Sequence, residues 1–155
     1  MYLVVNEWLP EYFLREATHE QKKLLQDFLN RFLVRQDILY VQEGSPFEEK
    51  IFRFAKENQQ YPVYQNIKKF VSNILKDNKR CQLVGIVEIL PLEIDERLNK
   101  LGTNYNSDRY LFETAWQIPE GQSKIIITTD GKLKTQMEGN GYFEVILLND
   151  FLQTY

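Results

Sequence analysis

The sequence contains only one cysteine and one histidine among its 155 residues. Neither a disulfide framework nor a zinc centre built from cysteine and histidine is therefore expected. Seven glycines and five prolines are too few for a collagen-like, linker-rich or disordered chain. If the protein uses a metal ion, its side-chain ligands must come mainly from carboxylates, which favour hard ions.

Long apolar runs are also missing. The longest nearly apolar run covers residues 84–92 and includes Glu88, well short of the ~20 residues that a membrane-spanning helix needs. The apolar segment at residues 1–5 is followed at once by Asn6 and Glu7, so it is too short for a signal peptide. The sequence predicts no membrane association and a cytoplasmic location.

Neither sign of charge dominates: 19 basic and 22 acidic side chains give a net charge of −3. No overall positive field would therefore recruit nucleic acid. A local basic segment is present, in which Lys69, Lys76 and Arg80 are predicted to share the helix face opposite an apolar stripe. This face is a candidate for contacts with RNA phosphates, and a solvated helix face is the alternative.

The sequence is rich in alternating strand-like and helical segments. Five apolar runs are typical of buried strands and lie at residues 2–6, 38–41, 82–86, 124–128 and 143–147. Helical patterns between them require crossover connections, which favour a mainly parallel sheet covered on both faces. We predict one three-layer α/β/α domain over residues 1–155, with a mainly parallel sheet of about five strands. The strands at residues 2–6, 82–86 and 124–128 are expected to be adjacent and parallel.

Polar and acidic side chains follow two of the predicted strands. Asn6 and Glu7 follow the first strand, Asp130 follows the strand at residues 124–128, and Asp108 begins the preceding helix. Ligands of open parallel sheets bind at the carboxyl ends of the strands. Carboxylates without cysteine or histidine suit Mg²⁺ or Mn²⁺, which polarise phosphodiesters. The alternatives are that Asp108 only complements a helix dipole and Asp130 only forms a turn.

The segment from Asp108 to Ala115, followed by the strand that ends in Thr128-Thr129-Asp130, resembles the C-terminal half of PIN-domain nucleases. In that family an Asp opens a helix that carries an Ala further on, and a hydrophobic strand ends in Thr-x-Asp. The order of elements along the rest of the chain is similar to the family's layout. The resemblance implies a PIN-like fold and an Mg²⁺- or Mn²⁺-dependent ribonuclease; many members are toxins of bacterial toxin–antitoxin pairs.

The resemblance also assigns roles to single residues. Asp108 and Asp130 match two of the family's metal ligands. Asn6 stands where the family usually has Asp, and its amide is a weaker, uncharged ligand. The family's mid-chain Glu is matched by Glu49, with Glu48 as the alternative. The implied catalytic set is therefore Asp108, Asp130, Asn6 and Glu49.

Two further residues lie next to this set. Glu7 substitutes for the charge that Asn6 does not supply, if the backbone turns at that point. Arg109, beside Asp108, either binds an RNA phosphate or pairs with Glu113.

Two functions remain open at this point. The first is a metal-dependent ribonuclease whose partner is RNA and, in a toxin–antitoxin pair, an antitoxin-like protein. The alternative is a catalytically reduced PIN-like module that binds RNA or a protein partner; a homodimer is a further arrangement. A metabolic α/β enzyme is disfavoured, because no glycine-rich phosphate loop follows any predicted strand.

Overall fold

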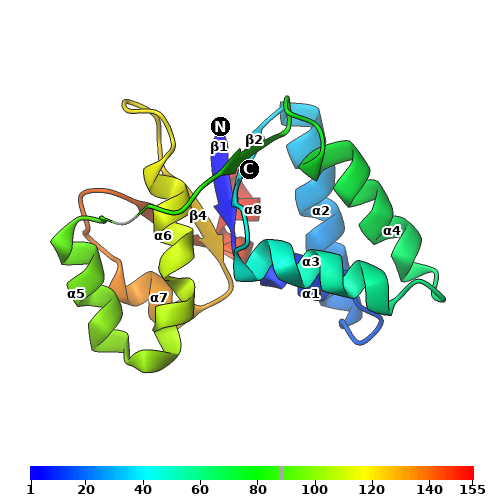
Figure 1. Cartoon of the computed structure of the whole chain (residues 1–155), viewed down its shortest axis with the longest axis horizontal. Helices are drawn as coiled ribbons and strands as arrows, with labels where there is room; N and C mark the ends of the chain where they lie inside the picture. Colours follow the sequence, from blue (N-terminus) through cyan, green and yellow to red (C-terminus); the bar gives the residue numbers. More distant parts are fainter. Residues whose placement is uncertain (88) are drawn as a thin grey trace.

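The computed structural model describes residues 1–87 and 89–155 and is built around a sheet of five parallel strands (Figure 1). The strands are β1 (Tyr2–Val5), β2 (Ile38–Gln42), β3 (Cys81–Val84), β4 (Ile125–Thr128) and β5 (Glu144–Leu147). Their order across the sheet is β3-β2-β1-β4-β5, and every neighbouring pair is parallel. The predicted α/β class with a parallel five-stranded sheet is confirmed.

One predicted strand neighbour is wrong. β1 and β4 are adjacent and parallel as expected, with Val4 beside Ile126, but β3 pairs with β2 and not with β1. The reason is burial. Most of β2 is buried, as an inner strand requires, whereas Gln82 and Leu83 of β3 are exposed, as at the edge of a sheet.

Helices cover both faces of this sheet. The α-helices are α1 (Trp8–Tyr12), α2 (His19–Arg35), α3 (Pro46–Glu57), α4 (Val63–Phe70), α5 (Leu92–Leu101), α6 (Arg109–Trp116), α7 (Gly131–Gln136) and α8 (Leu148–Thr154). A π-helical turn, η1 (Val71–Leu75), continues α4, and a 3₁₀ turn, η2 (Thr103–Asp108), precedes α6. In Figure 1, α5, α6 and α7 lie on one side of the sheet and α1–α4 on the other, which gives the expected three layers. Among the described residues, no helix combines the length and the apolar character needed to cross a membrane.

Side-chain caps fix the starts of α2 and α3. The Thr18 hydroxyl accepts a hydrogen bond from the Gln21 amide, and the Gln21 side chain accepts one from the Thr18 amide. The Ser45 hydroxyl accepts a hydrogen bond from the Glu48 amide, with Pro46 in the first turn. Such caps satisfy backbone N–H groups that a helix start leaves free. The cap of α3 also determines where this helix begins relative to the end of β2.

The buried core holds the end of β1 in place. Trp8, 2% exposed, follows β1 and packs edge-on against Phe28 of α2, with 5.4 Å between the ring centroids. Its indole Nε1 donates a hydrogen bond of 3.1 Å to the carbonyl oxygen of Ile127 in β4. Ile126 and Ile127 are fully buried beside β1. The residues between β1 and Trp8 are therefore anchored to the buried core.

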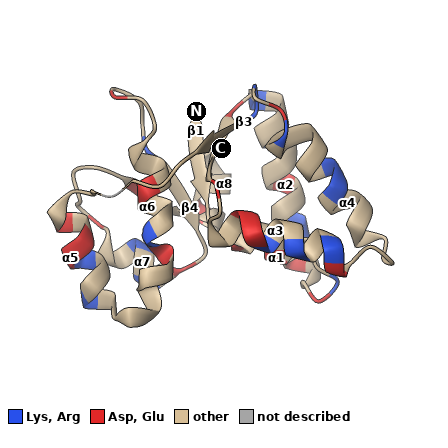
Figure 2. Cartoon of the chain, in the orientation of Figure 1, with Lys and Arg blue, Asp and Glu red and all other residues tan. Residues whose placement is uncertain are grey.

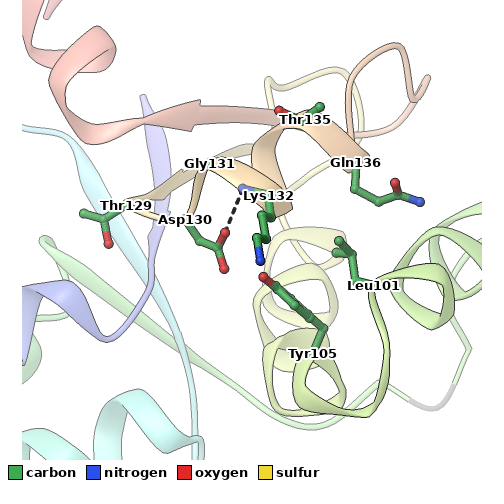
Figure 3. Close-up of a pocket in the computed structure, with 8 residues that line it drawn as sticks. All are labelled: Leu101, Tyr105, Thr129, Asp130, Gly131, Lys132, Thr135 and Gln136. Carbon is green, nitrogen blue, oxygen red and sulfur yellow. Dashed lines mark hydrogen bonds between the residues drawn. The ribbon is translucent and has the colours of Figure 1, made fainter.

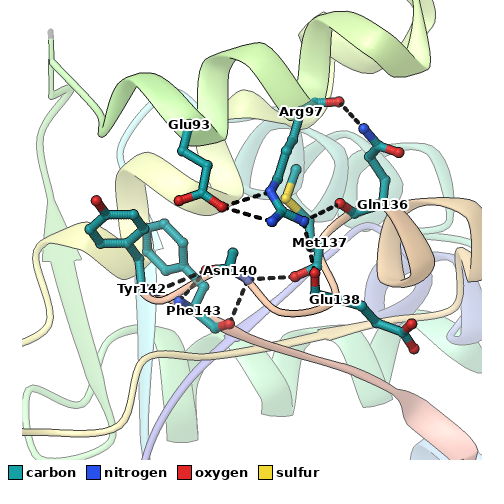
Figure 4. A network of polar contacts seen from close by, with 8 residues as sticks. All are labelled: Glu93, Arg97, Gln136, Met137, Glu138, Asn140, Tyr142 and Phe143. Carbon is teal, nitrogen blue, oxygen red and sulfur yellow. Dashed lines mark hydrogen bonds and ion pairs between the residues drawn. The ribbon is translucent and has the colours of Figure 1, made fainter.

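A polar network holds α5 against the end of α7 (Figure 4). The Arg97 guanidinium pairs with Glu93 on its own helix and donates hydrogen bonds to the carbonyl oxygens of Gln136 and Glu138. Asn140 closes the following turn through hydrogen bonds to neighbouring backbone groups. This network stabilises the arrangement of α5 and α7, which carry part of the hollow described below.

Candidate functional site

The carboxyl ends of β1 and β4 lie side by side because the two strands pair in parallel. Asn6 and Glu7 follow β1, and the Asn6 amide extends the pairing by donating a hydrogen bond of 3.3 Å to the Ile127 carbonyl. Thr129 and Asp130 follow β4. The structure thus brings to one sheet edge two of the segments in which the sequence predicts site residues.

Both polar atoms of the Asn6 side chain form hydrogen bonds. Its Nδ2 donates a hydrogen bond of 2.9 Å to the Thr128 hydroxyl, and its Oδ1 accepts one of 3.3 Å from the Trp8 amide. The Thr128 hydroxyl also accepts a hydrogen bond from the Asp130 amide at 3.0 Å. Asn6 therefore links the end of β1 to the turn before α7, but it adds no negative charge.

Asp130 caps α7 with one carboxylate oxygen. Its Oδ1 accepts hydrogen bonds from the Lys132 and Leu133 amides at 2.8 and 3.1 Å. This oxygen therefore has the structural role in a turn that the sequence offered as the alternative to metal binding. The cap does not use Oδ2. The carboxylate borders an open hollow that Tyr105 lines from the opposite side (Figure 3). Desolvation, followed by hydrogen bonding to the Asp130 carboxylate and by the charges of Asp130 and Asp108, raises the pKa of the Tyr105 hydroxyl.

Asp108 lies at the start of α6, and its carboxylate makes no capping hydrogen bond among the described contacts. Burial raises its pKa to about 6, and the negative charges of Glu7 and Asp130 contribute to this rise. The helix-dipole interpretation alone does not explain the rise, because a helix N-terminus favours the ionised carboxylate. Glu7, Asp108 and Asp130 therefore repel one another at this edge.

We expect Asp108→Asn to raise the free energy of unfolding at pH 7 by about 1–2 kcal/mol in buffer with EDTA. One pKa unit corresponds to about 1.4 kcal/mol, reduced here by solvent screening. The folded state binds this proton more tightly than the unfolded chain, whose carboxyl has the ordinary pKa of 3.8. Stability of the wild type should therefore fall as the pH rises from about 4 to about 6.

Urea unfolding of both proteins at several pH values measures this effect. In the Asp108→Asn variant, the part of this pH-dependent loss of stability that Asp108 causes should be absent. Identical pH profiles for the two proteins would contradict the electrostatic account of Asp108.

A divalent ion requires several oxygen ligands. Within residues 1–87 and 89–155, no three histidine, cysteine, aspartate or glutamate side chains form a ready-made metal centre. The donors that do converge are carboxylates, which suit Mg²⁺ or Mn²⁺, and Mg²⁺ commonly takes only one or two protein carboxylates and keeps water ligands. A cation would also relieve the repulsion around Asp108. The donor chemistry thus fits a hard divalent ion held by Asp108 and the Oδ2 atom of Asp130.

Glu48 and Glu49 lie at the start of α3. The Glu48 carboxylate accepts a hydrogen bond of 3.2 Å from the Gly44 amide, in keeping with a capping role. Glu49 is exposed. The charges that raise the pKa of Asp108 are those of Glu7 and Asp130, and neither Glu48 nor Glu49 is among them. A place for Glu49 or Glu48 in the site stays a prediction.

Sequence reasoning missed Lys50, which follows these two acids on α3. Its ammonium group lies 2.8 Å from a carboxylate oxygen of Glu7 and 2.8 Å from one of Glu11. Burial lowers the pKa of Lys50, but the hydrogen bonds and charges of the two glutamates outweigh it and raise the pKa overall. Figure 2 shows acidic and basic residues close together along α1 and α3. In the sequence, the four-residue spacing of Glu7 and Glu11 indicates that both carboxylates lie on one helix face, where a single cation can pair with them.

Arg109 is held by other side chains. Its guanidinium pairs with Asp95 at 3.1 Å and with Glu113 one helical turn further along α6. The other carboxylate oxygen of Glu113, which is 8% exposed, accepts a hydrogen bond of 3.2 Å from Gln42 of β2. Of the two predicted roles for Arg109, pairing with Glu113 is the one observed.

The predicted basic face is only partly present. Lys69 on α4 and Lys76 just after η1 are exposed. Arg80 does not share their helix, because the chain turns at Asp77 and the Arg80 side chain donates a hydrogen bond of 3.2 Å to the Leu33 carbonyl. The prediction that all three residues lie on one helix face is therefore wrong for Arg80.

Comparison of the chain with family models, with curated proteins and with solved structures gave no match. The resemblance of residues 108–133 to PIN-domain nucleases stays a prediction.

Proposed function

We propose that the chain is a PIN-like ribonuclease that uses Mg²⁺ or Mn²⁺ to cleave phosphodiester bonds in RNA. One observation carries the proposal: the Asp108 carboxyl is partly buried at the carboxyl edge of the sheet, and this burial, followed by the charges of Glu7 and Asp130, raises its pKa to about 6. Perturbed carboxylates at this edge of a parallel sheet are typical of ligand sites. The absence of cysteine and histidine from the cluster favours a hard ion.

Each residue of the site has a distinct task in this proposal. Asp108 and the Oδ2 atom of Asp130 hold the ion, which when bound supplies charge that polarises a phosphodiester and favours attack by water. Asn6 orients the turn that carries Asp130, through their shared hydrogen-bond partner Thr128. The open hollow beside Tyr105 gives the substrate access to the Asp130 carboxylate.

The choice of RNA as substrate depends on the resemblance to PIN-domain nucleases. Exposed Lys69 and Lys76 are the proposed contacts for its phosphates. We propose further that the protein acts in the cytoplasm as the toxin of a toxin–antitoxin pair, with an antitoxin-like protein partner.

A second candidate function is a PIN-like module that binds RNA or a protein without cleaving it. Two observations favour it. Asn6 supplies an amide where the family usually has an acid, and the Glu7 carboxylate is already paired with Lys50. Both features reduce the negative charge available to a metal ion.

The variant Asn6→Asp separates these candidates. The added carboxylate should lower the Kd for Mn²⁺ about tenfold, equivalent to about 1.4 kcal/mol of binding energy. The fold should tolerate the change, because the Thr128 hydroxyl can rotate to donate to the new carboxylate. If the chain is a ribonuclease, Mn²⁺ should raise the melting temperature of the wild type, and more so that of Asn6→Asp. Both proteins should then cleave a mixed RNA pool.

Asn78→Asp is the matched control, because it adds the same charge in the exposed turn before β3. It should leave metal binding and cleavage unchanged. If neither the wild type nor Asn6→Asp shows a Mn²⁺-dependent melting shift or any cleavage, the ribonuclease proposal is wrong and the binding module is favoured.

A further inference from the structure

The ion pair of Lys50 with Glu7 and Glu11 is a built cation site. The two glutamates are one helical turn apart, and one oxygen of each lies 2.8 Å from the same ammonium nitrogen. The side chain of Lys50 is 19% exposed and that of Glu7 26%, whereas that of Glu11 is 50% exposed, so the ammonium group is partly shielded from water on the side of Glu7. Two carboxylates thus already converge on a single positive charge, next to Asp108.

A second observation concerns Tyr110 on α6, which lies on the other side of the sheet from α3 (Figure 1). The side chain of Tyr110, on α6, is 7% exposed, and its hydroxyl has no hydrogen-bond partner among the described residues. Burial and then the charges of Glu7, Asp108 and Glu11 raise the pKa of this hydroxyl. A buried hydroxyl without a partner is costly unless another group satisfies it. The Tyr110 hydroxyl is therefore available to a ligand or water.

We propose that Lys50 occupies a second cation position of the site, formed by Glu7 and Glu11 beside Tyr110, and that its ammonium group excludes a divalent ion from this position. This inference deepens the proposed function and rests on metal binding at this edge of the sheet. Because Lys50 is paired with Glu7, the wild type offers a divalent ion only the Asp108 carboxylate and the Oδ2 atom of Asp130. Lys50 is in this sense a positioning residue that sets the affinity of the site for divalent ions.

The physical basis is competition between two cations for the same carboxylates. A divalent ion attracts a carboxylate more strongly than an ammonium group at equal distance, by Coulomb's law. It must first displace Lys50, however, and would leave that ammonium group partly buried without its partners, which is costly. Removal of the ammonium charge eliminates this competition and leaves Glu7 and Glu11 as a carboxylate pair that a divalent ion can neutralise.

Lys50→Met tests the proposal, because methionine fills similar space without the charge. We expect it to bind Mn²⁺ at least about tenfold more tightly than the wild type in calorimetric titration, and to gain a larger Mn²⁺-dependent rise in melting temperature. Lys56→Met is the matched control on the same helix: Lys56 is exposed, and its replacement should leave the Kd unchanged. Adding Glu11→Gln to Lys50→Met should abolish the gain in affinity.

The possible results are distinct. If Lys50→Met and the wild type bind Mn²⁺ equally well, the inference is overturned while the proposed function stands. If only Lys50→Met binds Mn²⁺, the inference is supported and the wild type is not a metal-loaded nuclease. If neither protein binds Mn²⁺, both proposals are wrong. Lys50→Gln, which can still donate hydrogen bonds to a carboxylate, provides the same test should the methionine variant fail to fold.

Discussion

Asp130→Asn should reduce Mn²⁺-dependent RNA cleavage by about 100-fold or more while the protein stays folded. Loss of the carboxylate removes a proposed metal ligand, and even changes to groups that only support metal ligands cost 10–100-fold. The fold should persist because asparagine caps helices about as well as aspartate, so the bonds to the Lys132 and Leu133 amides can form again. Cleavage of labelled RNA at saturating Mn²⁺, with the melting temperature measured in parallel, tests both parts.

Asp150→Asn is the matched control for this experiment, because Asp150 is exposed in the first turn of α8. It should cleave RNA at the wild-type rate. If Asp130→Asn also cleaves at the wild-type rate, the catalytic site lies elsewhere in the molecule. A loss of cleavage accompanied by unfolding would show instead that Asp130 acts mainly as the cap of α7.

Trp8→Ala should lower the free energy of unfolding by about 3–5 kcal/mol, as expected for loss of a buried large aromatic side chain. The indole is 2% exposed, packs against Phe28 and donates a hydrogen bond to the Ile127 carbonyl. The substitution leaves a cavity and removes one of the two hydrogen bonds that the Ile127 carbonyl accepts, the other coming from the Asn6 backbone amide. Since Trp8 directly follows Asn6 and Glu7, metal binding should weaken as well.

Denaturant unfolding followed by circular dichroism measures the stability change. Phe52→Ala is a suitable control because Phe52 is 46% exposed on α3, and its removal should cost less than about 1 kcal/mol. A Trp8→Ala variant no less stable than this control would show that Trp8 does not anchor the end of β1.

Much of the fold could be predicted from the sequence because its local signals agree with one another. The β-branched runs mark the strands, and the capping residues Thr18 and Ser45 mark where α2 and α3 begin. The order of the strands was harder to predict, because the pairing of β3 depends on burial across the whole sheet. Only the exposed polar side chain of Gln82 indicated an edge strand.

Part of the candidate site could also be predicted from local sequence signals. Asn6 and Asp130 follow strands, so a parallel sheet brings them to one edge. The side chain that α3 directs toward Glu7 could not be predicted, because it depends on how that helix is rotated against α1. The structure directs Lys50, not Glu49, toward Glu7. Pairing of Arg109 with Asp95 likewise depends on where α5 lies relative to α6, whereas its pairing with Glu113, one turn further along the same helix, was one of the two predicted roles.

A divalent ion is proposed to bind between Asp108 and Asp130. Nuclear magnetic resonance of the isotope-labelled protein, titrated with Mn²⁺ well below one equivalent, tests it most directly, because a bound paramagnetic ion broadens the signals of nearby amides. We predict that the amide signals of Asp108, Thr129 and Asp130 broaden first. Broadening that begins at the Glu48 and Glu49 amides, or that spreads evenly over the surface acids, would contradict the claim.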